Sequence, residues 1–67
     1  MTRECLLKRI AYFERRMKET IARQQDAEGK RAYAGARSKC QQAKRMLLCL
    51  DATGSVAGWV NYKLDGE

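Results

Sequence analysis

Two stripes of apolar residues at helical spacing, separated by a glycine, constrain this chain more than any other feature. The first stripe repeats every three or four residues and consists of Leu6, Ile10, Phe13, Met17 and Ile21. The second has similar spacing and consists of Tyr33, Ala36, Cys40, Ala43, Leu47 and Leu50. This periodicity places each stripe on one face of an α-helix. The sequence therefore predicts amphipathic helices over about residues 3–27 and 31–51, with a turn at about 28–30.

Gly29 lies between the stripes and is the best helix breaker there, because the chain contains no Pro. The two stripes stay nearly in phase, so periodicity alone also permits one continuous helix. Folding back at Gly29, however, sets large residues of the first helix opposite small residues of the second, which favours close packing. The facing pairs are then Leu6 with Leu50, Ile10 with Leu47, Phe13 with Ala43, Met17 with Cys40, Ile21 with Ala36, and Gln24 with Tyr33. We therefore predict an all-α helical hairpin of two long antiparallel helices.

The residues after Thr53 differ in composition from the helices. Gly54 is a natural stop for the second helix, and residues 55–64 are rich in β-branched and aromatic side chains. We expect a short C-terminal β-strand or extended tail. To satisfy its backbone, such a strand must lie on the helices, pair with another copy or join a partner's sheet. A β-hairpin of residues 48–52 with 56–62, which would shorten the second helix, is an alternative.

A chain of 67 residues forms a single domain at most, and a domain of that size buries only about 60% of its unfolded surface. Small domains gain further stability from disulfides, metals or oligomerisation. No metal site is expected, because the chain has no His and no Cys-x-x-Cys pair. Nothing resembles a signal peptide or a membrane span, so we expect a cytoplasmic protein with reduced thiols. Oligomerisation is then the remaining source of extra stability, so we predict a homodimer or higher oligomer that forms a helical bundle.

The three cysteines fall into two groups. Cys40 belongs to the apolar stripe and is expected to be a small core residue. Cys5 and Cys49 should lie close together at the open end of the hairpin, opposite the turn. They could form a disulfide or remain free thiols, and a reducing cytoplasm favours free thiols.

The net charge of +6 is concentrated in one segment. Residues 29–50 contain six Lys or Arg and no Asp or Glu, whereas residues 2–28 carry only +2. Residues spaced by seven align along a helix, which predicts a basic face on the second helix. The candidate partner-binding residues are Lys30, Arg31, Arg37, Lys44 and Arg45. Such a face suits DNA, RNA or an acidic protein groove, although a solvated face that keeps the protein soluble is the alternative.

Several apolar residues fall outside the predicted helix contact and need a cover. Aromatic residues in such positions often anchor protein interfaces. The candidate residues for a partner or oligomer interface are Leu7, Tyr12, Met46, Leu48, Trp59 and Tyr62. Trp59 is equally well explained as a cap on the core of its own subunit.

The sequence offers no catalytic constellation. It has no His for general base chemistry, no phosphate-binding glycine loop and no nucleophile motif. We therefore expect no enzyme activity and no cofactor. The leading hypothesis is a small binding protein that inhibits or regulates a host or partner protein by occlusion, and its size and composition are similar to those of accessory inhibitors of phages and mobile elements. The alternatives are nucleic-acid or nucleotide binding through the basic face and a purely structural oligomerisation unit.

Overall fold

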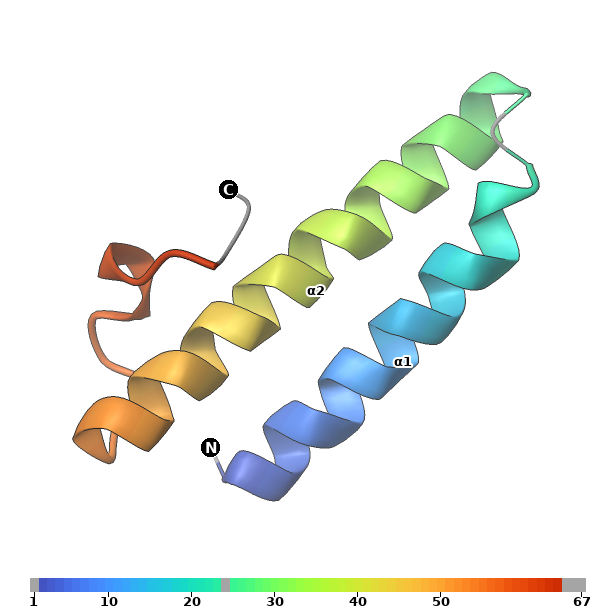
Figure 1. Cartoon of the computed structure of the whole chain (residues 1–67). Helices are drawn as coiled ribbons and strands as arrows, with labels where there is room; N and C mark the ends of the chain where they lie inside the picture. The colour runs from blue at the N-terminus through green and yellow to red at the C-terminus, as the bar shows by residue number, and fades with distance from the viewer. Residues whose placement is uncertain (1, 24, 65–67) are drawn as a thin grey trace.

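Two antiparallel helices packed along their length make up most of the molecule (Figure 1). The computed structural model describes residues 2–23 and 25–64. Helix α1 spans Arg3–Ile21, helix α2 spans Ala27–Thr53, and a short 3₁₀ helix, η1, spans Trp59–Asn61. The pair forms an elongated body of 41 × 22 × 16 Å. The predicted all-α helical hairpin is confirmed.

The connection between the helices comes earlier in the chain than the sequence predicts. α1 ends at Ile21, and Asp26 caps α2 by accepting a hydrogen bond from the Gly29 N–H at 2.6 Å. Aspartate is a strong N-cap because its carboxylate satisfies an amide at the helix start. Gly29 therefore lies in the first turn of α2, where an added Cβ would collide with the carbonyl of Arg23. A glycine is needed there for close approach of two backbone segments, and the prediction of Gly29 as the breaker is wrong.

The buried stripe of α1 ends differently from the prediction. Ile21 is 55% exposed, whereas Thr20 is buried and its hydroxyl donates to the Arg16 carbonyl at 2.8 Å. Ile21 lies only about 20° from the buried Ile10 around the helix axis, so its exposure goes with its place as the last residue of α1 and not with a change of helix face. The predicted pair of Gln24 with Tyr33 involves a residue outside the part of the chain that the structure describes.

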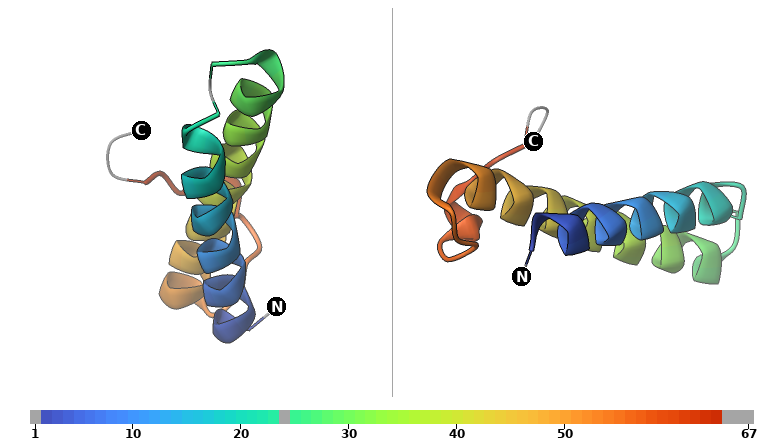
Figure 2. Two further views of the ribbon diagram at one scale, coloured as in Figure 1. Left: turned by 90° about the vertical axis from the view of Figure 1, so that its right-hand side faces the viewer. Right: turned by 90° about the horizontal axis from the view of Figure 1, so that it is seen from below.

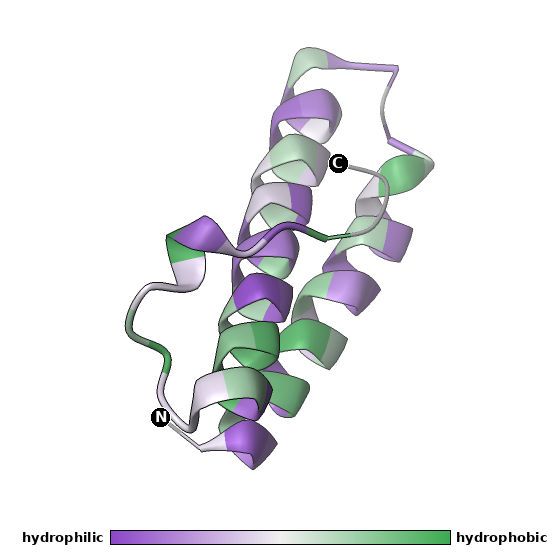
Figure 3. Cartoon of the chain, turned by 60° about the vertical axis from the view of Figure 1, so that its left-hand side comes forward, coloured by the Kyte–Doolittle hydropathy of each residue, from purple (hydrophilic) through white to green (hydrophobic). Residues whose placement is uncertain are grey.

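The core lies between the helices and is made of the predicted stripes. Ile10, Cys40 and Ala43 form its buried cluster, against which Phe13, Met17 and Leu47 pack. Leu6 is fully buried toward the open end. Apolar residues are concentrated on both helices toward that end (Figure 3). Large α1 residues therefore meet small α2 residues in the middle of the hairpin, as the size pattern predicts.

The tail folds back onto α2 instead of forming a strand. Gly54, with φ of 81°, caps α2 in the left-handed conformation, and Gly58, with φ of 84°, precedes η1. The Thr53 hydroxyl accepts a hydrogen bond from the Ser55 N–H, and the Cys49 thiol donates to the Ala57 carbonyl at 3.2 Å. A lone strand would have no neighbouring strand to pair with, and these local hydrogen bonds satisfy the polar groups of the tail instead. No strand occurs in the described part of the chain, so neither the predicted strand nor the alternative β-hairpin is present.

The tail contacts α2 (Figure 2). It lies on a different side of α2 from α1, so α2 is the middle element of three. In residues 2–23 and 25–64 no helix is long and apolar enough to cross a bilayer.

Candidate binding surfaces

One side of the contact between α1 and α2 carries a groove made of two adjoining depressions. The first, of about 360 Å³, is lined by Arg9, Phe13, Lys39, Gln42, Ala43 and Met46. The second, of about 270 Å³, has Tyr12, Arg16, Arg31 and Gly35 in its lining, together with the same Phe13 and Lys39. The two depressions adjoin at Phe13 and Lys39, which line both, and together they are called here the cationic groove.

The helical repeat explains why these residues lie together. Residues three or four apart share a helix face, and the α1 side of the groove uses Arg9, Phe13 and Arg16. The α2 side uses positions 31, 35, 39, 42 and 46, again at steps of three and four. Most of these positions lie beside the buried stripe of their own helix, so packing of the core brings them to the same side of the hairpin. Arg31 is the exception, because it is about 180° from Cys40 around α2, although its side chain still lines the second depression.

The groove is positively charged and has an aromatic side chain at its centre. Its described lining contains four cations, Arg9, Arg16, Arg31 and Lys39, and no carboxylate. Arg16 has an exposed partner in Glu19 at 3.5 Å. In the described residues the other three form no ion pair with a carboxylate. A recess with this charge is electrostatically complementary to an anion.

Two adjacent aromatic residues shape the groove. The rings of Tyr12 and Phe13 meet edge to face with centroids 5.1 Å apart, a favourable arrangement. The Lys39 Nζ lies 6.0 Å from the centroid of the Phe13 ring, at the limit of a cation–π contact. Phe13 is half-buried, while Tyr12 remains 51% exposed. Tyr12 is thus held by a contact with Phe13 while about half of the residue stays exposed to solvent.

A third depression, of about 280 Å³, has a different character. It is lined by Glu14, Met17, Lys18, Ile21, Tyr33 and Lys44. Its charges are of both signs and its floor is apolar, so it shows no preference for an anion.

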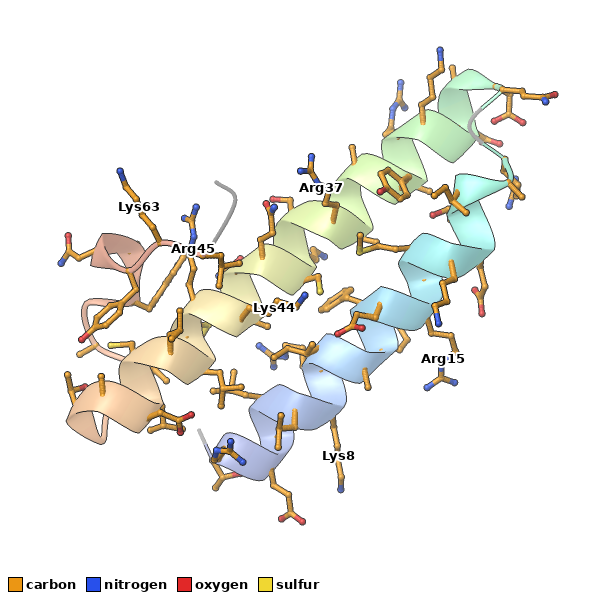
Figure 4. All side chains as sticks on the ribbon, viewed as in Figure 1. Lys8, Arg15, Arg37, Lys44, Arg45 and Lys63 are labelled. Atoms are coloured by element: carbon orange, nitrogen blue, oxygen red, sulfur yellow. The ribbon has the colours of Figure 1, made fainter. Side chains whose placement is uncertain are left out.

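The structure divides the five predicted basic residues among several surfaces. Arg31 lines the cationic groove, whereas Lys44 lines the mixed depression. These two are thirteen positions apart, which separates them by about 140° around α2. Arg37 points away from α1 (Figure 4) and Lys30 is exposed. Arg45 is half-buried on the side of α2 that faces away from α1.

The predicted interface residues are also divided. Tyr12 and Met46 line the cationic groove, while Leu7 and Leu48 are each 42% exposed. Leu48 lies nine positions from Lys39, which puts it about 180° away around α2. Trp59 and Tyr62 are half-buried in the tail.

Sequence reasoning missed Arg9, Arg16 and Lys39 as candidate binding residues. The signal was present in α1. Three acid-to-base pairs at a spacing of four, beginning at Glu4, Glu14 and Glu19, account for several of its charges. Arg9 and Arg16 are two of the four cations left over, and because they are seven positions apart they share a face.

The cysteines differ in environment. Cys40 is buried as predicted, and burial raises the pKa of its thiol, with Lys44 opposing this effect. Cys5 is exposed, and hydrogen bonding to the Thr2 side chain lowers the pKa of its thiol. Cys49 is fully buried, and its thiol donates a hydrogen bond to the Ala57 carbonyl in the tail. None of the three cysteines forms a disulfide.

The described residues contain no cluster of three or more His, Cys, Asp or Glu that could hold a metal ion. In comparisons with known proteins, no protein family, no curated protein and no solved structure matches the chain.

Proposed function

We propose that this chain is a small non-catalytic binding protein that attaches to an anionic macromolecular partner and regulates that partner by occlusion. The cationic groove is the observation that supports this proposal. It combines cations from both helices with a half-exposed tyrosine, and its described lining contains no acid. The chain would act in the cytoplasm, where its three free thiols stay reduced.

Charge determines which partners suit the groove. Two copies of the chain would repel each other through this surface, because like charges face like. An anionic surface is attracted instead, with faster association at low salt. The groove therefore favours a foreign partner over a second copy.

A charge-matched pair of double variants tests the proposal. Arg9→Gln with Lys39→Gln removes two charges from the groove, and Lys8→Gln with Arg15→Gln removes two from α1, where both point away from α2 (Figure 4). Both proteins retain a net charge of +4, two below the +6 of the parent. Retention on a sulfated polysaccharide column should fall much more for the groove pair. Equal losses would mean that overall charge, not the groove, attracts anions, and the proposal would fail.

A protein partner that docks on apolar side chains is a second candidate, favoured by the exposure of Leu7 and Leu48. These exposed side chains would contact a host protein, as for an accessory inhibitor of a phage or mobile element, or a second copy in a homodimer. Leu7→Ser combined with Leu48→Ser should then abolish association seen by sedimentation velocity. A monomer of 7.7 kDa for the parent chain would remove the homodimer.

A further inference from the structure

We infer that the cationic groove binds single-stranded nucleic acid, with a base stacked on Tyr12 and phosphates held by Arg9, Arg16, Arg31 and Lys39. This inference rests on the proposed anion-binding function and names the partner class. Single strands are held without sequence preference by a positive groove that follows the backbone and by aromatic side chains that stack on bases. Both elements occur together in this recess.

The order of residues along α1 fits a nucleotide chain. Arg9 precedes Tyr12 by three residues and Arg16 follows it by four, so the two guanidinium-bearing positions lie about 4.5 Å and 6 Å along the helix axis on either side. A base on the Tyr12 ring would therefore have a cation on each side of it for the flanking phosphates. Arginine suits this role because its planar group forms two parallel hydrogen bonds to a phosphate.

Tyr12 favours nucleic acid over an acidic peptide. Its ring meets that of Phe13 in a T-shaped contact, and the residue is 51% exposed. Every base has a flat face that stacks on such a ring, whereas aspartate and glutamate side chains offer none. The four cations suit a nucleic acid and an acidic peptide equally, so the exposed tyrosine is the feature that favours nucleic acid.

The α2 side of the groove has room for the strand. Gly35 lies in the same depression as Tyr12 and Arg16, and a Cβ placed on it would have no atom within 4 Å. The α2 side runs from Arg31 to Met46, which spans about 22 Å of helix. B-form duplexes are usually read by a helix or ribbon that protrudes into the major groove. These cations line a recess instead, so a single strand fits better than a duplex.

Fluorescence anisotropy with a labelled 15-nucleotide oligothymidylate tests the inference. Each phosphate contact in a single strand contributes a slope of about −0.7 to log K against log salt. Four contacts then predict about a 50-fold loss of affinity between 50 and 200 mM salt. Tyr12→Ala should weaken binding about 5- to 150-fold, the effect of losing one stacked base. Tyr62→Ala, an aromatic removed from the tail, should leave affinity within about 2-fold of the parent.

A steric variant gives an independent test that does not remove charge. Gly35→Leu should fill the groove and reduce affinity at least 10-fold, while Gly35→Ala adds only a Cβ into open space and should bind as the parent does. Both changes raise helix propensity, so loss of helical circular dichroism is not expected for either. Full binding by Gly35→Leu would place the strand elsewhere and overturn the inference.

Polyglutamate and a duplex of equal length distinguish the remaining outcomes. Preference for the single strand, lost in Tyr12→Ala, supports the inference. Equal binding of polyglutamate and oligothymidylate, with no effect of Tyr12→Ala, would overturn it and leave the proposed anion-binding function standing. Preferential binding of the duplex would also overturn it. Binding of none of the three at 50 mM salt would refute both the inference and the proposed function.

Discussion

Gly29 and Gly35 provide a matched test of how the hairpin is connected. Both glycines lie in α2 with helical neighbours, and alanine is favoured over glycine in a helix by up to about 1 kcal/mol. An alanine at Gly35 would meet no atom within 4 Å, whereas one at Gly29 would collide with the carbonyl of Arg23. The same substitution should therefore have opposite effects at the two positions.

The size of the difference follows from what blocks the new methyl group. Overpacking a tight site costs about 1–3 kcal/mol. The cost at Gly29 belongs in the upper part of that range, because the obstacle is backbone that cannot change rotamer. Subtracting the helix-propensity gain leaves a net loss of about 1–2 kcal/mol for Gly29→Ala. Gly35→Ala should gain about 0.5–1 kcal/mol, since nothing opposes it.

Thermal unfolding followed by circular dichroism at a fixed protein concentration measures both changes. In a domain of this size 1 kcal/mol shifts the midpoint by about 4–8 °C. The midpoint should rise for Gly35→Ala and fall for Gly29→Ala, with a gap of about 6 °C or more between the variants. If the midpoints of the two variants rise together, the Arg23 carbonyl does not lie against residue 29, and the close approach of the two backbone segments is refuted.

Other predictions concern the core, the cap and the thiols. Leu6→Ala should lower the free energy of unfolding in urea by about 2–5 kcal/mol, because Leu6 is fully buried. Asp26→Ala should cost about 0.5–2 kcal/mol while Asp26→Asn retains the cap, and equal losses would show that the carboxylate is not capping α2. Iodoacetamide at pH 7.5 should modify Cys5 first, because it is exposed and its pKa is lowered, as mass spectrometry can check. Burial raises the pKa of the Cys40 thiol, so the protonated thiol stabilises the fold fully at a pH below the pKa that the thiol has in the unfolded chain. This stabilisation should be lost as the pH rises above about 8.5, and Cys40→Ala should not show the loss.

Helical periodicity was sufficient to predict the hairpin and most of its core. Cys40, Ala43 and Ile10 are buried where the stripes place them, because side chains spaced by three and four residues must share a helix face. The position of the connection was not predictable from glycine content. Asp26 was a competing start signal, and its capping bond, together with backbone packing against Gly29, determines where α2 begins.

The binding surface was less predictable than the fold, because it depends on how two helices are rotated against each other. Arg31 and Lys44 belong to the same acid-free segment but line different depressions. Arg9 and Lys39 are thirty residues apart and line the same one. The sequence shows how much charge each helix carries, whereas packing decides which charges meet. The β-propensity of the tail was likewise overridden by local hydrogen bonds around Thr53.

The covering of α2 bears on why the proposed anion-binding residues come from both helices. Cys40 and Cys49 are nine positions apart, which puts them about 180° apart around α2. Both are at most 2% exposed, one beneath α1 and the other beneath the tail. Two opposite sides of α2 are therefore occupied, and Arg45 is half-buried on a third part of its surface. Lys30, Arg37 and Lys44 nevertheless stay exposed on α2, so packing leaves these cations apart from the groove, whereas Arg9 and Arg16 of α1 join Arg31 and Lys39 in its lining.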